Sequence, residues 1–156
     1  MRVLSLPLYM LLVAAPILSS QSVRNEASLP WGPAPAVFPW GARMAVVSGD
    51  PAKAAEFTVM LTFPDGYQIP PHFHPTDETV TVKSGMLLVG MGDTLDRSKT
   101  SPMTGGATGT IPAQAHHFAI ASGDTKIIIS AMGPFAMTYV NPADDPQTQK
   151  PKPHRR

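Results

Sequence analysis

The sequence GYQIPPHFHPTDETVTVKSG (residues 66–85) carries the strongest structural signal in this 156-residue chain. It places His72 and His74 two residues apart and Glu78 four residues beyond His74. Successive side chains of a β-strand point to opposite faces, so residues i and i+2 share a face. We therefore expect both imidazoles to point to the same side of an extended segment.

Pro75 and Thr76 interrupt this strand, and the alternation that resumes after them puts Glu78, Val80 and Val82 on one face. Two imidazole nitrogens and a carboxylate then converge from one short segment, which is the ligand chemistry of a divalent transition metal. Apart from His154 in the tail, the remaining histidines are His116 and His117. A third imidazole is available only from that pair.

These residues resemble the first motif of the cupin superfamily, which is glycine, five residues, His-x-His, three or four residues, glutamate, six residues and glycine. The matching positions are Gly66, His72, His74, Glu78 and Gly85. The second cupin motif is matched at Gly106, Pro112 and His117. Gln114 and Ala121 stand where that motif has glycine and asparagine. A glycine at 114 would supply a positive φ, so the turn before His117 is in question.

The resemblance covers residues 41–141 and implies an all-β fold, a single cupin-type (jelly-roll) β-barrel. It implies a metal ion held by His72, His74, Glu78 and His117. The segment GPFAMTYVNPADDP (residues 133–146) is also similar to the ending of small, single-domain bacterial cupins (monocupins) of unassigned activity. No internal repeat is visible, so we expect one barrel and not two.

Composition agrees with such a fold. A hydrophobic content of 43% and 18 prolines suit a compact, turn-rich β protein better than a disordered chain. The chain has no cysteine, so nitrogen and oxygen atoms must provide all metal ligands. With 12 basic and 11 acidic residues, the net charge of +1 gives no reason to expect a nucleic-acid partner.

Residues 1–21 have the pattern of a signal peptide: Arg2, an apolar run over 3–18, and the small residues Ser19 and Ser20. Pro7 and Pro16 argue against a membrane-spanning helix, although an uncleaved anchor is the alternative. The lack of cysteine argues against a lipid-modified anchor. We expect a periplasmic or secreted protein with no stable membrane anchor.

Residues 22–40 combine four prolines with Trp31, Phe38 and Trp40. We expect an extended arm whose aromatic rings lie across the barrel or across a neighbouring subunit. The alternative is that Trp31 or Trp40 lines a ligand pocket. Residues 142–156 are prolines, charges and amides, and are expected to form a disordered tail.

Between these segments, alternation predicts strands at 42–47 and 56–63, followed by the histidine-bearing strand. We expect turns at 84–85 and 122–124, with strands at 86–91, 126–132 and 135–140. Residues 92–110 are polar and glycine-rich, which predicts a surface loop with one helical turn near Leu95. A lid over the site is the alternative for that loop.

Several other residues have both a structural and a functional interpretation. His116 should point away from His117, and its alternative role is as the third ligand. Asp77 should hydrogen-bond in the turn, with a general base as the alternative. Ordinary strand positions are expected for Tyr67 and Gln68, which could instead be donors at the pocket mouth. Core packing rather than metal ligation is expected of four methionines, Met86, Met91, Met103 and Met132.

Four nitrogen and oxygen ligands leave open positions on a metal that prefers five or six, so water, dioxygen or a chelating substrate can bind. Without thiolates, a closed structural zinc site is disfavoured, and Mn, Fe, Ni, Co and Zn are all candidates. The alternative is a metal-free polar network. Burying a carboxylate beside imidazoles costs several kcal/mol, roughly, unless a cation or proton neutralises it.

Two classes of function fit these expectations. The first is a metalloenzyme acting on a small oxygen-bearing molecule (enol, phenolic or diketone-like), for which the resemblance implies a dioxygenase-type oxidoreductase, an isomerase or a decarboxylase. The second is a non-catalytic small-ligand binding or sensor cupin. The export signal argues against a transcription regulator. A homodimer is implied by the resemblance alone.

Overall fold

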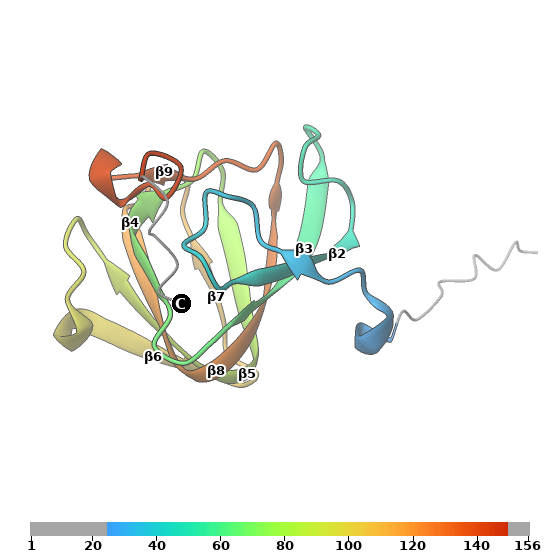
Figure 1. Cartoon of the computed structure of the whole chain (residues 1–156), viewed down its shortest axis with the longest axis horizontal. Coiled ribbons are helices and arrows are strands. Elements are labelled where there is room, and N and C mark those ends of the chain that lie inside the picture. Colours follow the sequence, from blue (N-terminus) through green and yellow to red (C-terminus); the bar gives the residue numbers. More distant parts are fainter. Residues whose placement is uncertain (1–24, 150–156) are drawn as a thin grey trace, which may run out of the picture.

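The computed structural model describes residues 25–149, and most of this part of the chain is β-strand (Figure 1). The strands are β1 (Gly32–Pro33), β2 (Arg43–Ser48), β3 (Glu56–Phe63), β4 (Gln68–Phe73), β5 (Glu78–Met91), β6 (Thr100–Thr104), β7 (Thr108–Ile111), β8 (His117–Met132) and β9 (Thr138–Tyr139). Three short 3-10 turns are η1 (Glu26–Ser28), η2 (Arg97–Lys99) and η3 (Pro142–Asp144). Over the described range, no helix has the length and apolar character needed to cross a membrane.

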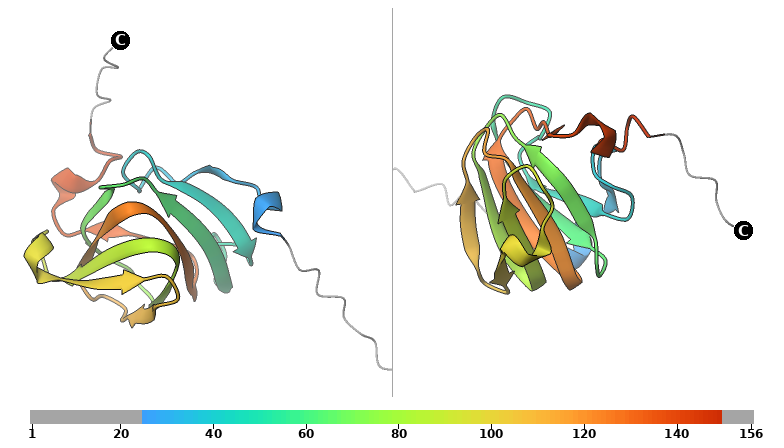
Figure 2. Two further views of the ribbon diagram at one scale, coloured as in Figure 1. Left: turned by 90° about the horizontal axis from the view of Figure 1, so that it is seen from below. Right: turned by 90° about the vertical axis from the view of Figure 1, so that its left-hand side faces the viewer.

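The long strands β5 and β8 form the centre of the fold. They pair antiparallel from Glu78 opposite Ala131 to Met91 opposite His117. On the outer edge of β5, the first half pairs with β7 and the second half with β6. On the outer edge of β8, the first half pairs with β4 and the second half with β3. The β5–β8 ladder therefore belongs to both walls of a curled sheet, as Figure 2 shows.

The ladder is irregular near two glycines, one in each strand. Gly85 in β5 and Gly123 in β8 have φ of 78° and 76°, and the register shifts between Val82 and Met86. The buried Thr125 joins the two strands here, because its hydroxyl lies 3.0 Å from the Met86 carbonyl oxygen. Bulges of this kind increase the local twist and let a strand change direction without ending.

The turns expected at 84–85 and 122–124 are therefore wrong. Both segments lie inside continuous strands, and the chain does not reverse at either one. A glycine with positive φ is compatible with a turn or with a bulge. A bulge forms here because the register of the β5–β8 ladder shifts on both sides of Ser84. The pairing of the two strands then continues past both glycines.

The surface loop expected at 92–110 is also wrong in part. Its second half forms β6 and most of β7, which are edge strands on the two halves of β5. Paired threonine hydroxyls support the β5–β7 edge, with Thr79 and Thr110 3.2 Å apart and Thr81 and Thr108 2.9 Å apart. An exposed edge tolerates polar residues, which is why composition alone indicated a loop. The helical turn expected near Leu95 is present as η2.

The other core strands follow the expected pattern. β3 has the predicted bounds, β2 is displaced by one residue, and Phe57, Val59, Leu61 and Phe63 are buried in the main core. The last strand is shorter than predicted, because only Thr138–Tyr139 pair with β4. Met91 and Met132 are 55% and 50% exposed, so the prediction of core packing is wrong for these two methionines.

The described residues of the N-terminal segment, 25–40, contact the barrel. β1 pairs with β2, Leu29 packs in a small cluster with Ala45 and Met60, and Glu26 pairs with Lys126 of β8. Trp40 is 98% exposed, so its ring does not cover the barrel.

The expected disorder from residue 142 does not hold for 142–149, which contain η3. The expected signal peptide (1–21) and residues 150–156 of the expected tail lie outside the described residues.

Two motif glycines give a test of the bend. A Cβ added at Gly66, where φ is 74°, meets no atom within 4 Å, whereas one at Gly85 would lie 2.8 Å from Cα of Thr125. We expect Gly66→Ala to lower the free energy of unfolding by about 1–2 kcal/mol through backbone strain alone. Gly85→Ala should cost at least about 1 kcal/mol more, because backbone atoms must also move. Urea unfolding measures both, and equal losses would contradict the close approach at Gly85.

Candidate metal centre

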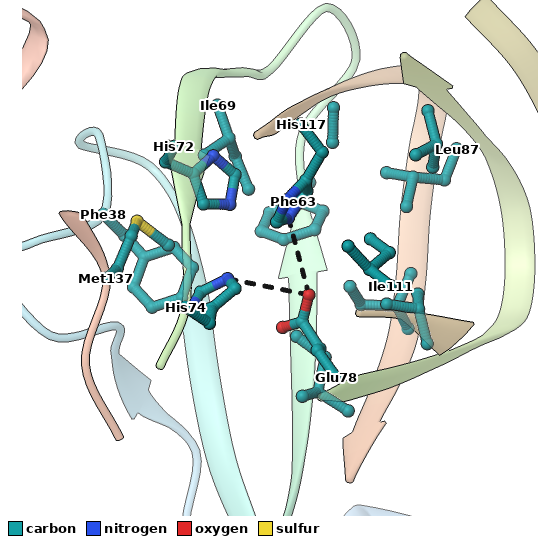
Figure 3. Close-up of a pocket in the computed structure, with 15 residues that line it drawn as sticks. Phe38, Phe63, Ile69, His72, His74, Glu78, Leu87, Ile111, His117 and Met137 are labelled. Atoms are coloured by element: carbon teal, nitrogen blue, oxygen red, sulfur yellow. Dashed lines mark ion pairs between the residues drawn. The ribbon is translucent and has the colours of Figure 1, made fainter. Parts of the chain in front are cut away.

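Four side chains from three parts of the chain meet inside the barrel (Figure 3). His72 lies in β4, His74 follows that strand directly, Glu78 begins β5 and His117 begins β8. All four are at least 94% buried. One ring nitrogen from each histidine can be chosen so that all three atoms lie within 4.8 Å of one another. Three buried histidines at this spacing could hold a metal ion.

Local backbone geometry sets the orientation of each imidazole. The Nδ1 atoms lie at hydrogen-bond distance from backbone carbonyl oxygens: Pro70 for His72 (2.7 Å), Ala136 for His74 (2.8 Å) and Ala115 for His117 (3.0 Å). A carbonyl oxygen only accepts, so Nδ1 must carry the hydrogen in each ring. In the neutral ring, Nε2 then carries a lone pair that is free to bind a metal.

The carboxylate of Glu78 faces two of these nitrogens. Its Oε2 is 3.6 Å from Nε2 of His74 and 3.7 Å from Nε2 of His117, too far for a hydrogen bond. Among residues 25–149, Nε2 of His74 is the one buried side-chain nitrogen or oxygen atom without a hydrogen-bond partner. Lone pairs and a carboxylate thus converge in a region shielded from water, where each unpaired group is costly.

A proton at His72 is a poor means of neutralising this cluster. Burial lowers the pKa of His72 well below its ordinary value of 6.5, and the neighbouring His117 and His74 lower it further. The hydrogen bond to Pro70 acts in the opposite direction but is the smallest contribution. The donor set therefore fits a divalent cation better than a protonated ring.

Beyond these four residues the pocket is apolar. The other eleven lining residues are Phe38, Phe63, Ile69, Val80, Leu87, Val89, Ile111, Ala119, Ile127, Ile129 and Met137. The volume that the centres of water molecules can occupy is about 30 Å³, which is room for no more than a few waters. The pocket thus combines one polar cluster with a narrow hydrophobic chamber.

The sequence correctly distinguished the two adjacent histidines. His116 is partly exposed, with Nδ1 2.6 Å from a carboxylate oxygen of Asp93 and its ring stacked on Phe73. It lies outside the cluster that His117 joins. Asp77 accepts a hydrogen bond from the Ala113 N–H at 2.8 Å, which is the turn role expected of it.

The turn before His117 keeps the conformation that a glycine would favour. Gln114 has a φ of 61°, and in the described part of the chain it is the one non-glycine residue with positive φ. Its N–H donates to the His74 carbonyl oxygen at 2.9 Å, which links the two histidine segments. Placing a side chain there costs roughly 1–2 kcal/mol of strain, and the turn forms nonetheless.

Sequence reasoning missed two residues of the pocket wall, Phe38 and Met137. Phe38 comes from the arm. The alternative that Trp31 or Trp40 lines a ligand pocket is wrong for this pocket, because neither tryptophan is among its lining residues. Tyr67 and Gln68 do not line it either, and no residue of 92–110 covers it. The aromatic content of the arm was a signal for contact with the barrel, but it did not identify the ring involved.

Comparison with known proteins extends only to structure. No protein family model matches the chain, and no curated protein matches it. Solved structures do match. A recombinant oxalate oxidase in complex with glycolate aligns with 67% of this chain at 25% identity and a TM-score of 0.52. This chain spans 58% of the length of that oxalate oxidase chain.

Two further matches cover most of their own chains. KdgF from Halomonas sp. aligns with 69% of this chain and 89% of its own, at 19% identity and a TM-score of 0.56. An RmlC-like cupin from Shewanella frigidimarina aligns with 72% of this chain and 91% of its own, at 15% identity and a TM-score of 0.57. Each of these similarities concerns the arrangement of the barrel.

The lowered pKa of His72 predicts how pH affects the metal-free protein. Below pH 6.5 the unfolded chain protonates this ring while the folded chain does not, so the free energy of unfolding falls as pH falls. His72 lowers the free energy of unfolding by up to about 1.4 kcal/mol for each pH unit below 6.5. Above pH 6.5 this effect vanishes, because the ring is neutral in both the folded and the unfolded chain. Urea unfolding at several pH values should give a shallower slope for His72→Gln. His116→Gln is the control, and an unchanged slope in His72→Gln would contradict the assignment.

Proposed function

We propose that this small single-domain protein, whose fold is that of the cupin superfamily, binds a divalent transition metal and acts on a small oxygen-bearing molecule. The ligands we propose are His72, His74, Glu78 and His117. The observation that carries the proposal is the convergence of three imidazoles whose Nδ1 atoms all face carbonyl oxygens. A cation between the Nε2 lone pairs and the Glu78 carboxylate would satisfy both kinds of group.

Charge supports a particular kind of partner for such a metal. Three neutral imidazoles and one carboxylate leave a divalent ion with one uncompensated positive charge. A second anionic oxygen donor, such as an enolate or a carboxylate, would neutralise it in a chamber where charge is costly. Mn, Fe, Ni, Co and Zn all accept this ligand set, and a bound metal would supply Lewis acidity or dioxygen activation.

The pocket wall supports a small ligand with an apolar body. No lysine or arginine is among the lining residues, so a second negative charge on the ligand would have no counter-ion in the described pocket. The solved oxalate oxidase binds glycolate, a small oxygen-bearing molecule. By analogy, a dioxygenase-type oxidoreductase is our preferred activity, and an isomerase or decarboxylase fits the same ligand set.

A second candidate function is favoured by one specific observation. Apart from the four proposed ligands, the described pocket has no titratable side chain that could act as general acid or base. A non-catalytic protein that binds or senses a small molecule through its metal would need none. We also propose export through the sequence of residues 1–21 and a homodimeric assembly, for which the sequence is the basis.

Metal content tests the ligand assignment, with two adjacent histidines as a matched pair. We expect one divalent ion per chain by elemental analysis after loading. His117→Ala should weaken metal affinity by at least about 100-fold, since loss of even an outer partner typically costs 10–100-fold. His116→Ala should leave affinity unchanged, because its ring lies outside the cluster.

Competition with a chelator gives both affinities. Glu78→Gln should weaken binding less than His74→Ala, because an amide oxygen can still coordinate. Equal losses in His116→Ala and His117→Ala would overturn the ligand assignment.

Turnover separates the two candidate functions. Metal-loaded protein should consume dioxygen or convert substrate with a panel of small enols and 1,3-diketones, and His72→Ala should abolish this activity. A fully loaded protein that is inert across the panel, yet rises in melting temperature with one of these molecules, would favour the binding function instead.

A further inference from the structure

Phe38 reaches the metal pocket from outside the strands that form the barrel. It belongs to the N-terminal arm, is 6% exposed and lines the pocket together with the proposed ligands. Figure 3 shows its ring beside Met137, on the side of the pocket where His74 lies. Phe38 is the lining residue that comes from the arm, and Met137 is the one that comes from residues 133–137. Together these two side chains close one wall of the pocket.

Two tyrosine hydroxyls hold the backbone on either side of this ring. The Tyr139 hydroxyl donates to the Val37 carbonyl oxygen at 2.7 Å, and the Tyr67 hydroxyl donates to the Pro39 carbonyl oxygen at 2.5 Å. Both tyrosines are buried, and burial raises the pKa of each phenol, so both remain protonated donors. An arm held by hydrogen bonds to the residues before and after Phe38 cannot easily withdraw that side chain.

The ring of Phe135, in the segment before β9, packs against Phe38. Phe135 stacks on it with a centroid distance of 5.9 Å and an interplanar angle of 3°. Phe135 also lies 5.7 Å from the ring of His74, whose Nδ1 faces the carbonyl oxygen of Ala136. The segment that orients a proposed ligand therefore also supports the ring that limits the chamber.

The small chamber follows from this arrangement. With Phe38 in place, the space open to water centres is about 30 Å³, too little for a phenyl ring beside the metal. Removing the Phe38 ring would leave a space of that shape within the same pocket. The exposed Trp40, two residues along the arm, contributes nothing to this wall.

We propose that Phe38 is the specificity-determining residue of this pocket, setting the upper size limit of the molecule that binds the metal. Tyr67 and Tyr139 are positioning residues that keep its ring in the chamber. This inference rests on the proposed metal site for the ligand's attachment point. It adds that the arm, and not the barrel, decides which molecules fit.

Formate and benzoate test the size limit, because they share one carboxylate and differ by a phenyl ring. The visible absorption of Co²⁺-loaded protein reports binding of each anion. We expect the unmodified protein to bind formate and to bind benzoate weakly. Phe38→Ala should improve benzoate affinity at least about tenfold, because the phenyl ring of benzoate can then be buried in the space that Phe38 leaves. Formate affinity should stay within about twofold. Trp40→Ala, the control from the same arm, should change neither affinity.

The tyrosines have their own readout. Tyr67→Phe and Tyr139→Phe remove the hydroxyls without removing the rings, and each should raise the benzoate-to-formate affinity ratio by a smaller factor than Phe38→Ala. A purely structural role would lower the melting temperature and leave this ratio unchanged. If Phe38→Ala does not fold, Phe38→Leu provides the same comparison with a smaller expected gain.

The outcomes separate the two proposals. Protein that takes up no Co²⁺ would overturn the metal site and the size limit with it. Protein that binds Co²⁺ and formate, but whose affinity ratio is the same with and without the Phe38 ring, would overturn the size limit alone. Tight benzoate binding by the unmodified protein would do the same.

Discussion

The curvature of the β5–β8 ladder is the constraint on which the site depends. Glu78 begins β5 and His117 begins β8, so the two residues stand at opposite ends of the same antiparallel ladder. In a flat ladder, the thirteen steps from Glu78 to Met91 would separate these ends by roughly 40 Å. In the protein, Oε2 of Glu78 is 3.7 Å from Nε2 of His117. The bend near Gly85 and Gly123 is what brings side chains from both ends of one pair of strands into the same cluster.

Backbone carbonyl groups orient the three imidazoles that this curvature brings together. Each of the three imidazoles turns the same nitrogen, Nδ1, towards a carbonyl oxygen, and these carbonyls belong to three separate segments. None of this requires a charged partner for the histidines. The result is a buried cluster with an excess of lone pairs, which a cation among them would stabilise. The fold thus supports the proposed metal binding through backbone carbonyl groups, which fix the orientation of the three imidazoles.

The N-terminal arm contributes Phe38 to the wall of the same pocket. Its prolines prevent long regular structure, and its position depends on a two-residue strand, an ion pair at Glu26 and two tyrosine hydroxyls. Because one of its rings lines the metal pocket, the arm is part of the site and not only a cover for the barrel.

The sequence by itself determined the features that depend on neighbouring residues. Strand alternation put His72 and His74 on one face, separated His117 from His116, and gave β3 its bounds, because side-chain direction in a strand is a local property. Tertiary structure decided the features for which local signals are ambiguous. Gly85 has the same positive φ in a turn and in a bulge, and only the partner strand 38 to 40 positions away selects the bulge. Phe38 lines the pocket because hydroxyls 28 and 102 residues distant from their acceptors fix the arm, a long-range contact that no local pattern contains.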